Sequence, residues 1–184
     1  MKIVEVRRHS IRRDGKNLSP EGVALAEKVR EDLAPSYDLY ITSSKERTRE
    51  TMEAFGFTSY TVDDSFTTLD DSVLAKYRRE IEEVARREGC SPLYAAFEVP
   101  EAAEALRRAG QTYLRALKRV ATRLPEGGRA LVVSHGGAIE PAALLGFKTY
   151  HLKEIGGELK PCEGAVFYFE GDDLAKVEIK RNVR

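Results

Sequence analysis

The stretch VEVRRHSIRR (residues 4–13) places four arginines around one histidine, directly after a short apolar run. The whole chain contains only three histidines, so a histidine within this basic cluster stands out. The apolar run at residues 3–6 is typical of a β-strand, and the basic residues then begin the loop behind it. Positive charge concentrated at the end of a strand indicates a site that binds an anion.

The composition restricts what that anion can be. The chain has 184 residues, which is room for one domain with a substantial core. Thirty Lys and Arg residues balance thirty Asp and Glu residues, so the formal net charge at pH 7 is zero. A neutral protein has no overall field that attracts nucleic acid or an anionic membrane, and we expect neither as a partner.

The cysteines and the N-terminus indicate the compartment. Cys90 and Cys162 are too few and too far apart for a disulfide framework or a zinc knuckle. Met1 leads directly into the first expected strand, without an apolar signal core. No apolar run approaches the about 20 residues that a membrane span needs. We therefore expect a cytoplasmic protein, and the sequence leaves its oligomeric state open.

Strand-like and helix-like segments alternate along the chain. Strands are expected at residues 3–6, 38–44, 59–62 and 129–135, and the segments 165–171 and 174–180 alternate like a hairpin. Helices are expected from residue 20, over 45–55 and 138–147, and over 73–87 and 101–124. The helix at residue 20 has a clear start, with Ser19 as N-cap and Pro20 as first helical residue.

This order predicts an α/β fold. We expect three layers, α/β/α, with a mixed, mostly parallel central sheet that is covered on both faces. The helices at 73–87 and 101–124 form a helical insertion at about residues 67–124.

Polar residues begin the loop after three of the expected strands. They are Arg8 and His9 after the first, Ser43, Ser44 and Arg47 after the second, and Ser134, His135, Gly136 and Gly137 after the third. In an open parallel sheet, ligands bind beyond the carboxyl ends of the strands. We therefore expect the two histidines and the arginines to converge, although they lie far apart in the sequence.

Three motifs resemble those of the histidine phosphatase superfamily, which has the phosphoglycerate mutase-like fold. RRHSIRR (residues 7–13) resembles its Arg-His-Gly signature, with Ser10 where the family usually has glycine. TSSKERTRET (42–51) resembles its Thr-Ser-Pro-Leu-x-Arg-Ala-x-Gln-Thr element, and VVSHGGAIE (132–140) resembles its Ser-His-Gly-Gly element. The order and spacing also fit, and the resemblance covers nearly the whole chain. It implies a single histidine phosphatase-like domain over residues 1–184.

The resemblance also implies roles for individual residues. His9 matches the family's nucleophile, which attacks a phosphoryl group to give a phosphohistidine that water then hydrolyses. Arg8 and Arg47 match its phosphate-binding arginines, and His135 matches the second histidine of its phosphate pocket.

Three further arginines belong to the first motif. Arg12 stands three residues after His9, as an arginine does in the acid phosphatase and phytase branch, and we expect it to be a further phosphate ligand. Arg7 and Arg13 match nothing in the family, and we expect both to face solvent.

The chemistry of these side chains agrees with the resemblance. A phosphoryl group in transfer spreads negative charge over its oxygens, and planar guanidinium groups bind that charge in a bidentate way. The surrounding cations also disfavour protonation of His9, which keeps the imidazole neutral for attack. Its other nitrogen needs an acceptor such as a backbone carbonyl. We expect no metal or other cofactor.

The general acid is less well defined. A leaving alkoxide needs a proton from a nearby group, and a threonine stands near the position where relatives often have a glutamate. The nearest carboxylates are Asp70, which we expect to be the donor, and Asp71, while Glu140 is a further candidate. Without an acid, substrates with good leaving groups are favoured, including phosphoramidates such as phosphohistidine on proteins.

The sequence therefore predicts a cofactor-independent phosphatase that acts on a small phosphorylated substrate or a phosphoprotein. Two alternatives stay open: a non-catalytic module of the same fold that binds a phosphorylated ligand, and a phosphotransferase of the phosphoglycerate mutase type. The identity of the substrate would be set by the insertion and cannot be read from the motifs.

Overall fold

The computed structural model describes residues 1–182, apart from the side chain of Asp71, and within them the chain forms a six-stranded sheet. Its strands run in the order β3 (Thr61–Val62), β2 (Leu39–Thr42), β4 (Arg129–Ser134), β1 (Lys2–Arg8), β5 (Gly164–Glu170) and β6 (Asp173–Lys180). The strands β3, β2, β4 and β1 are parallel, whereas β5 is antiparallel to both of its neighbours. The sheet is mixed and mostly parallel, as predicted.

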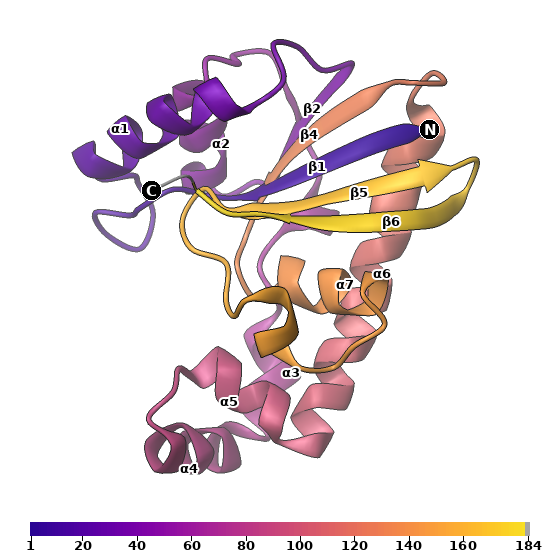
Figure 1. The fold of residues 1–184 in the computed structure, drawn as a ribbon. Coiled ribbons are helices and arrows are strands. Elements are labelled where there is room, and N and C mark those ends of the chain that lie inside the picture. The colour runs from indigo at the N-terminus through magenta and orange to yellow at the C-terminus, as the bar shows by residue number, and fades with distance from the viewer. Residues whose placement is uncertain (183–184) are drawn as a thin grey trace.

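Helices cover both faces of the sheet (Figure 1). On one face lie α1 (Pro20–Val29) and α2 (Glu46–Ala54), and on the other lie α6 (Pro100–Arg123) and α7 (Ile139–Gly146). Because side chains alternate along a strand, Leu131 and Val133 of β4 pack on the first pair, while Val132 packs on the second. The predicted three-layer α/β/α architecture is confirmed.

The helix α1 begins as its sequence predicts. The Ser19 Oγ accepts a hydrogen bond from the Gly22 N–H at 3.0 Å, and Pro20 occupies the first helical position. Gly22 lies so close to the loop behind β1 that an added Cβ would come within 2.1 Å of the Ile11 carbonyl oxygen. Glycine is therefore needed here for α1 to pack against the loop that follows the first strand.

The segment between β3 and β4 differs from the prediction in detail. The helix expected at 73–87 is two helices, α3 (Asp71–Ala75) and α4 (Arg78–Glu88), and α5 (Pro92–Glu98) was not predicted. These helices share a further hydrophobic cluster with the first part of α6, and this cluster includes Ile81, Ala95 and Leu106. In Figure 1, α4 and α5 extend away from the sheet. Three short 3-10 helices complete the fold: η1 (Arg30–Asp32), η2 (Asp64–Phe66) and η3 (Leu152–Ile155).

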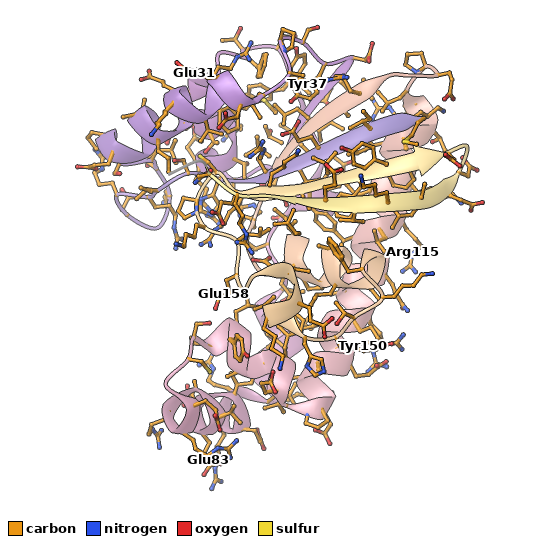
Figure 2. The ribbon with its side chains drawn as sticks, viewed as in Figure 1. Glu31, Tyr37, Glu83, Arg115, Tyr150 and Glu158 are labelled. Atoms are coloured by element: carbon orange, nitrogen blue, oxygen red, sulfur yellow. The ribbon has the colours of Figure 1, made fainter. Side chains whose placement is uncertain are left out.

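Arg7 is buried, so the expectation that it faces solvent was wrong. Its side chain is only 3% exposed, and its Nε donates to Glu5 Oε1 at 2.8 Å. The second oxygen of Glu5 accepts from the hydroxyl of Tyr37, labelled in Figure 2, at 2.6 Å. Glu5 and Arg7 are two residues apart on β1 and share one face of the strand, which lets them neutralise each other. Arg13 is exposed, as expected.

Among the described residues, none of the helices has both the length and the hydropathy that are needed to cross a bilayer.

Candidate functional site

The neighbouring strands β1 and β4 bring two histidines together. Arg8, the last residue of β1, pairs with Ser134, the last residue of β4, and the two strands run in parallel. The His9 N–H donates to the Ser134 carbonyl oxygen at 2.9 Å. The rings of His9 and His135 lie with their centroids 5.3 Å apart. This pair stands at the carboxyl ends of the parallel strands, where a ligand site is expected.

The two ring nitrogens of His9 differ: one is hydrogen-bonded, and the other has an available lone pair. Its Nδ1 lies 2.8 Å from the carbonyl oxygen of Ser10, and because a carbonyl only accepts hydrogen bonds, Nδ1 carries the proton. The lone pair of Nε2 is then available. Burial lowers the pKa of His9 to about 4, and the charges of Arg47 and Arg8 act in the same direction. The imidazole is therefore neutral at physiological pH.

His135 is held by Ser43, which the sequence places after the second strand without giving it a role. Its Nε2 lies 2.8 Å from the Oγ of Ser43, in the loop behind β2. Burial, followed by the charge of Arg47, lowers the pKa of His135 to about 2. Its Nδ1 is buried and has no hydrogen-bond partner in the described part of the chain. The only sequence signal for Ser43 is its place directly after a strand.

Arg8 packs against the glycine loop behind β4. A Cβ on Gly136 would come within 2.9 Å of the Arg8 Nε, so the guanidinium group fits only because residue 136 is glycine. One terminal nitrogen of Arg8 donates to the Leu159 carbonyl oxygen. The Arg8 Nε is buried without a partner among the described residues.

Arg47 and Arg12 add positive charge from two other segments. Arg47, on α2, donates to the Gly15 carbonyl oxygen at 3.4 Å, while its Nε is buried and lacks a partner among the described residues. Partial burial and the nearby charge of Arg12 both lower the pKa of Arg47. Arg12 is exposed and pairs as an isolated bridge with Leu18. The structure thus brings Arg8, Arg47 and Arg12 to the two histidines.

Ser10, which departs from the family motif, is built into the structure. Its side chain is fully buried, and its Oγ donates to the Gly22 carbonyl oxygen at 2.6 Å. Its N–H donates to the Oγ1 of Thr51 at 3.0 Å. Ser10, the residue next to His9, is therefore hydrogen-bonded to both α1 and α2.

Glu140 is fully buried at the start of α7. One of its oxygens accepts from the Gly137 N–H at 2.7 Å, and the other accepts from the Leu159 N–H at 3.1 Å. Burial raises the pKa of this carboxyl group. Because both oxygens accept from backbone donors, Glu140 holds the loop at Gly136 and Gly137 against the segment before β5.

Asp70 and Asp71 lie at the start of α3. Asp70 is exposed and caps the helix, because its Oδ1 accepts from the Ser72 N–H at 2.8 Å. This hydrogen bond lowers the pKa of Asp70. No hydrogen bond or ion pair joins Asp70 to His9 in the described part of the chain. The side chain of Asp71 lies outside the described residues.

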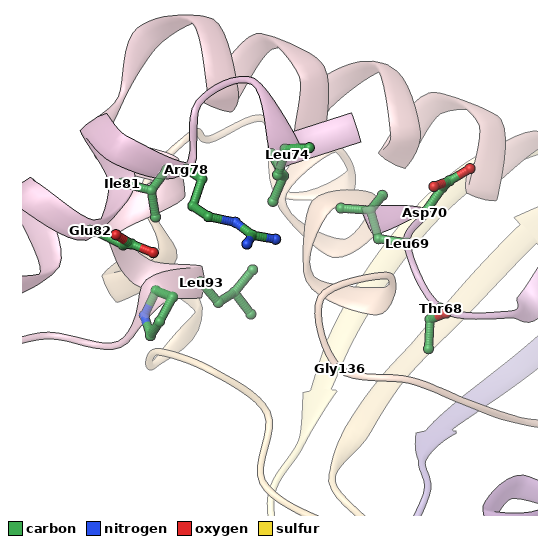
Figure 3. A pocket seen from close by; sticks show the side chains of 11 residues that line it. Thr68, Leu69, Asp70, Leu74, Arg78, Ile81, Glu82, Leu93 and Gly136 are labelled. Carbon is green, nitrogen blue, oxygen red and sulfur yellow. The ribbon is translucent and has the colours of Figure 1, made fainter. Parts of the chain in front are cut away.

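A pocket of about 440 Å³ opens beside Gly136 (Figure 3). Its walls come from residues 68–70 and from the helices α3, α4 and α5. Within the described side chains, no group of three or more His, Cys, Asp or Glu residues is arranged to hold a metal ion.

The two lowered histidine pKa values predict a pH dependence of stability. A histidine whose folded pKa lies below its ordinary 6.5 takes up a proton in the unfolded chain first. The contribution of each histidine to the free energy of unfolding is therefore fully present above pH 6.5, and it is lost as the pH falls toward the folded pKa. Between pH 7.5 and 5.5, we expect each histidine to remove about 1.4 kcal/mol of unfolding free energy.

Urea unfolding at the two pH values checks this. We expect the histidine-dependent decrease in unfolding free energy to be about halved in His9→Asn and in His135→Asn. In His151→Asn, which changes an exposed position, the full decrease should remain. An equal loss in all three variants would contradict the assignment.

The fold is shared with solved structures of low sequence identity. Phosphoglycerate mutase from Bacillus anthracis str. Sterne is 15% identical, with 97% of this chain and 91% of that chain covered and a TM-score of 0.67. Phosphoserine phosphatase from Entamoeba histolytica, in complex with 3-phosphoglyceric acid, is 14% identical, with 99% and 98% covered and a TM-score of 0.65. A mycobacterial glucosyl-3-phosphoglycerate phosphatase is 17% identical, with 98% and 97% covered and a TM-score of 0.60.

The sequence of the chain matches a family model over most of its length. No curated protein matched the chain. The family model of the histidine phosphatase superfamily (branch 1) matches residues 5–179, which include the two histidines and the arginines of the site. The chain therefore belongs to the histidine phosphatase superfamily.

Proposed function

We propose that this protein is a phosphatase that hydrolyses a phosphomonoester or a phosphoramidate through a phosphohistidine on His9. In this proposal the Nε2 of His9 attacks phosphorus and the bond to the leaving group breaks. Water then cleaves the phosphorus–nitrogen bond, which releases phosphate and restores His9. Arg8, Arg47 and Arg12 bind the phosphoryl oxygens, and His135 contributes to the same pocket.

One observation carries the proposal. The Arg8 Nε, the Arg47 Nε and the His135 Nδ1 are buried and have no partner among the described residues. Buried polar atoms are nearly always hydrogen-bonded, and an arginine Nε can only donate, so these atoms beside a neutral histidine favour a ligand rich in oxygen acceptors. A phosphoryl group supplies such oxygens, and the free lone pair of His9 supplies the nucleophile.

The proposal assigns no carboxylate as general acid. Asp70 caps α3 with a lowered pKa, and both oxygens of Glu140 are bound to backbone donors. A group that must give up a proton at neutral pH works best with a pKa near that pH, which the exposed Asp70 does not have. Substrates whose leaving group needs little protonation, phosphoramidates among them, suit this site.

The alternatives are a mutase-type phosphotransferase and a non-catalytic binding module. Both would use the same arginines, but a binding module has no need for a histidine whose proton sits on Nδ1 and whose Nε2 is free. No observation in the structure favours the transferase over hydrolysis.

Trapping the intermediate tests the proposal. We expect the purified protein to hydrolyse p-nitrophenyl phosphate in the presence of EDTA, because arginines carry the charge stabilisation. Vanadate should inhibit this activity. A quench in base during turnover of a ³²P-labelled aryl phosphate should leave an adduct that survives base and is lost in acid. Activity that EDTA abolishes and a divalent ion restores would contradict the metal-independent mechanism.

A further inference from the structure

The pocket beside Gly136 lies where the leaving group of the proposed reaction would be. Gly136 contacts Arg8 on one side and lines the pocket on the other, so the cavity adjoins the proposed phosphate site. Its volume of about 440 Å³ is of the size that holds a small organic ligand. The inference drawn from this pocket rests on the proposed function, because it concerns the part of the substrate that departs from phosphorus.

The pocket walls are mostly apolar. The apolar lining residues are Leu69, Leu74, Ala75, Ile81, Pro92 and Leu93. A polyhydroxylated leaving group such as a sugar would lose its hydrogen bonds with water against such walls and gain few in return. The walls therefore favour a leaving group with a hydrocarbon or aromatic body.

One cation points into this apolar space. In Figure 3 the guanidinium group of Arg78 lies in the middle of the pocket, between Leu93 and Leu74. None of the described side chains forms an ion pair with it. A guanidinium group pairs strongly with a carboxylate or a phosphate, and the Arg78 side chain is accessible from solvent. We propose that Arg78 recognises an anionic substituent, a carboxylate or a second phosphate, on a leaving group with an apolar body.

The two described carboxylates of the pocket are placed differently. Asp70 is engaged in capping α3. Glu82 follows Arg78 by one turn of α4, and in the view of Figure 3 it lies on the side of Arg78 away from Gly136. A substituent on a leaving group that enters from Gly136 therefore meets Arg78 before it meets Glu82.

Aryl phosphates with substituents of different charge test this inference. The probes are phenyl phosphate, its 3-carboxy and 4-carboxy derivatives, and 3-(aminomethyl)phenyl phosphate. We expect at least one carboxylate probe to have a higher kcat/KM than phenyl phosphate. Arg78→Ala should lower the ratio of these two values about tenfold or more, the scale of a charge-assisted hydrogen bond. Arg78→Lys should lower it less.

Arg79→Ala is the matched control, because Arg79 is the next residue and is exposed like Arg78, but does not line the pocket. We expect it to leave the ratio unchanged. An equal ratio in wild type and Arg78→Ala would overturn the inference while phenyl phosphate turnover still supports the proposed function. A preference for the aminomethyl probe that Glu82→Gln abolishes would also overturn it. Absence of phosphatase activity on every probe would overturn both.

Discussion

Replacing His9 by alanine is expected to lower kcat for p-nitrophenyl phosphate by about 10⁴-fold or more, the scale seen when a catalytic nucleophile is removed. The reason is that Nε2 of His9 is the proposed nucleophile, free because Nδ1 donates to the Ser10 carbonyl oxygen. Without it, no phosphoenzyme can form. Steady-state kinetics on purified variants measure the loss, and the base-stable adduct should vanish with it.

The third histidine supplies the control for this prediction. His151 is exposed and lies just before η3. We expect His151→Ala to keep wild-type turnover, which excludes a general effect of removing an imidazole. A folded His9→Ala protein that retained substantial turnover and an adduct would show that the nucleophile is another residue.

The second large effect is expected at Arg8. We expect Arg8→Ala to lower kcat/KM by about 10³-fold and Arg8→Lys by about 10²-fold, since lysine keeps the charge but loses the planar fork that binds two oxygens. Gly136→Ala should approach the effect of Arg8→Lys, because its methyl group would occupy space within 2.9 Å of the Arg8 Nε. Circular dichroism establishes that each variant is folded before kinetics are compared.

Arg13 provides a matched control in the same basic stretch. Its side chain is 67% exposed and pairs only with neighbouring Asp14 among the described residues. We expect Arg13→Ala to change kcat/KM by less than about twofold, the usual range for a surface ion pair. If Arg13→Ala and Arg8→Ala were equally impaired, a general loss of positive charge would explain the data better than a specific phosphate contact.

The sequence predicted those parts of the site that depend on strand ends. Parallel strands with polar residues directly after them must bring those residues to one edge of a sheet, and this placed His9 beside His135. This placement follows from the parallel pairing of β1 and β4, so it could be predicted without knowing any side-chain contact. The same reasoning could not find Leu159, because its contribution comes from its backbone N–H and carbonyl group.

Other differences arose where local patterns were ambiguous. The helix α5 has the same start signal as α1, a serine N-cap followed by proline, but Pro92–Glu98 is too short to show a clear helical period. Arg7 was expected to face solvent because it matches nothing in the family motif. Its partner Glu5, two residues earlier on the same strand face, was the available signal for a buried pair.

The separate hydrophobic cluster of the helices between β3 and β4 bears on how the protein can diverge. Its buried residues, such as Ile81 and Ala95, belong to neither of the two clusters that hold the sheet. A substitution in α4 therefore alters the wall of the pocket without disturbing the packing that aligns β1 with β4, whereas Tyr94 and Phe97 of α5 also pack against the cluster of the sheet. Under the proposed function, divergence in α4 changes the part of the substrate that the pocket accepts, while His9 and His135 keep their places at the strand ends.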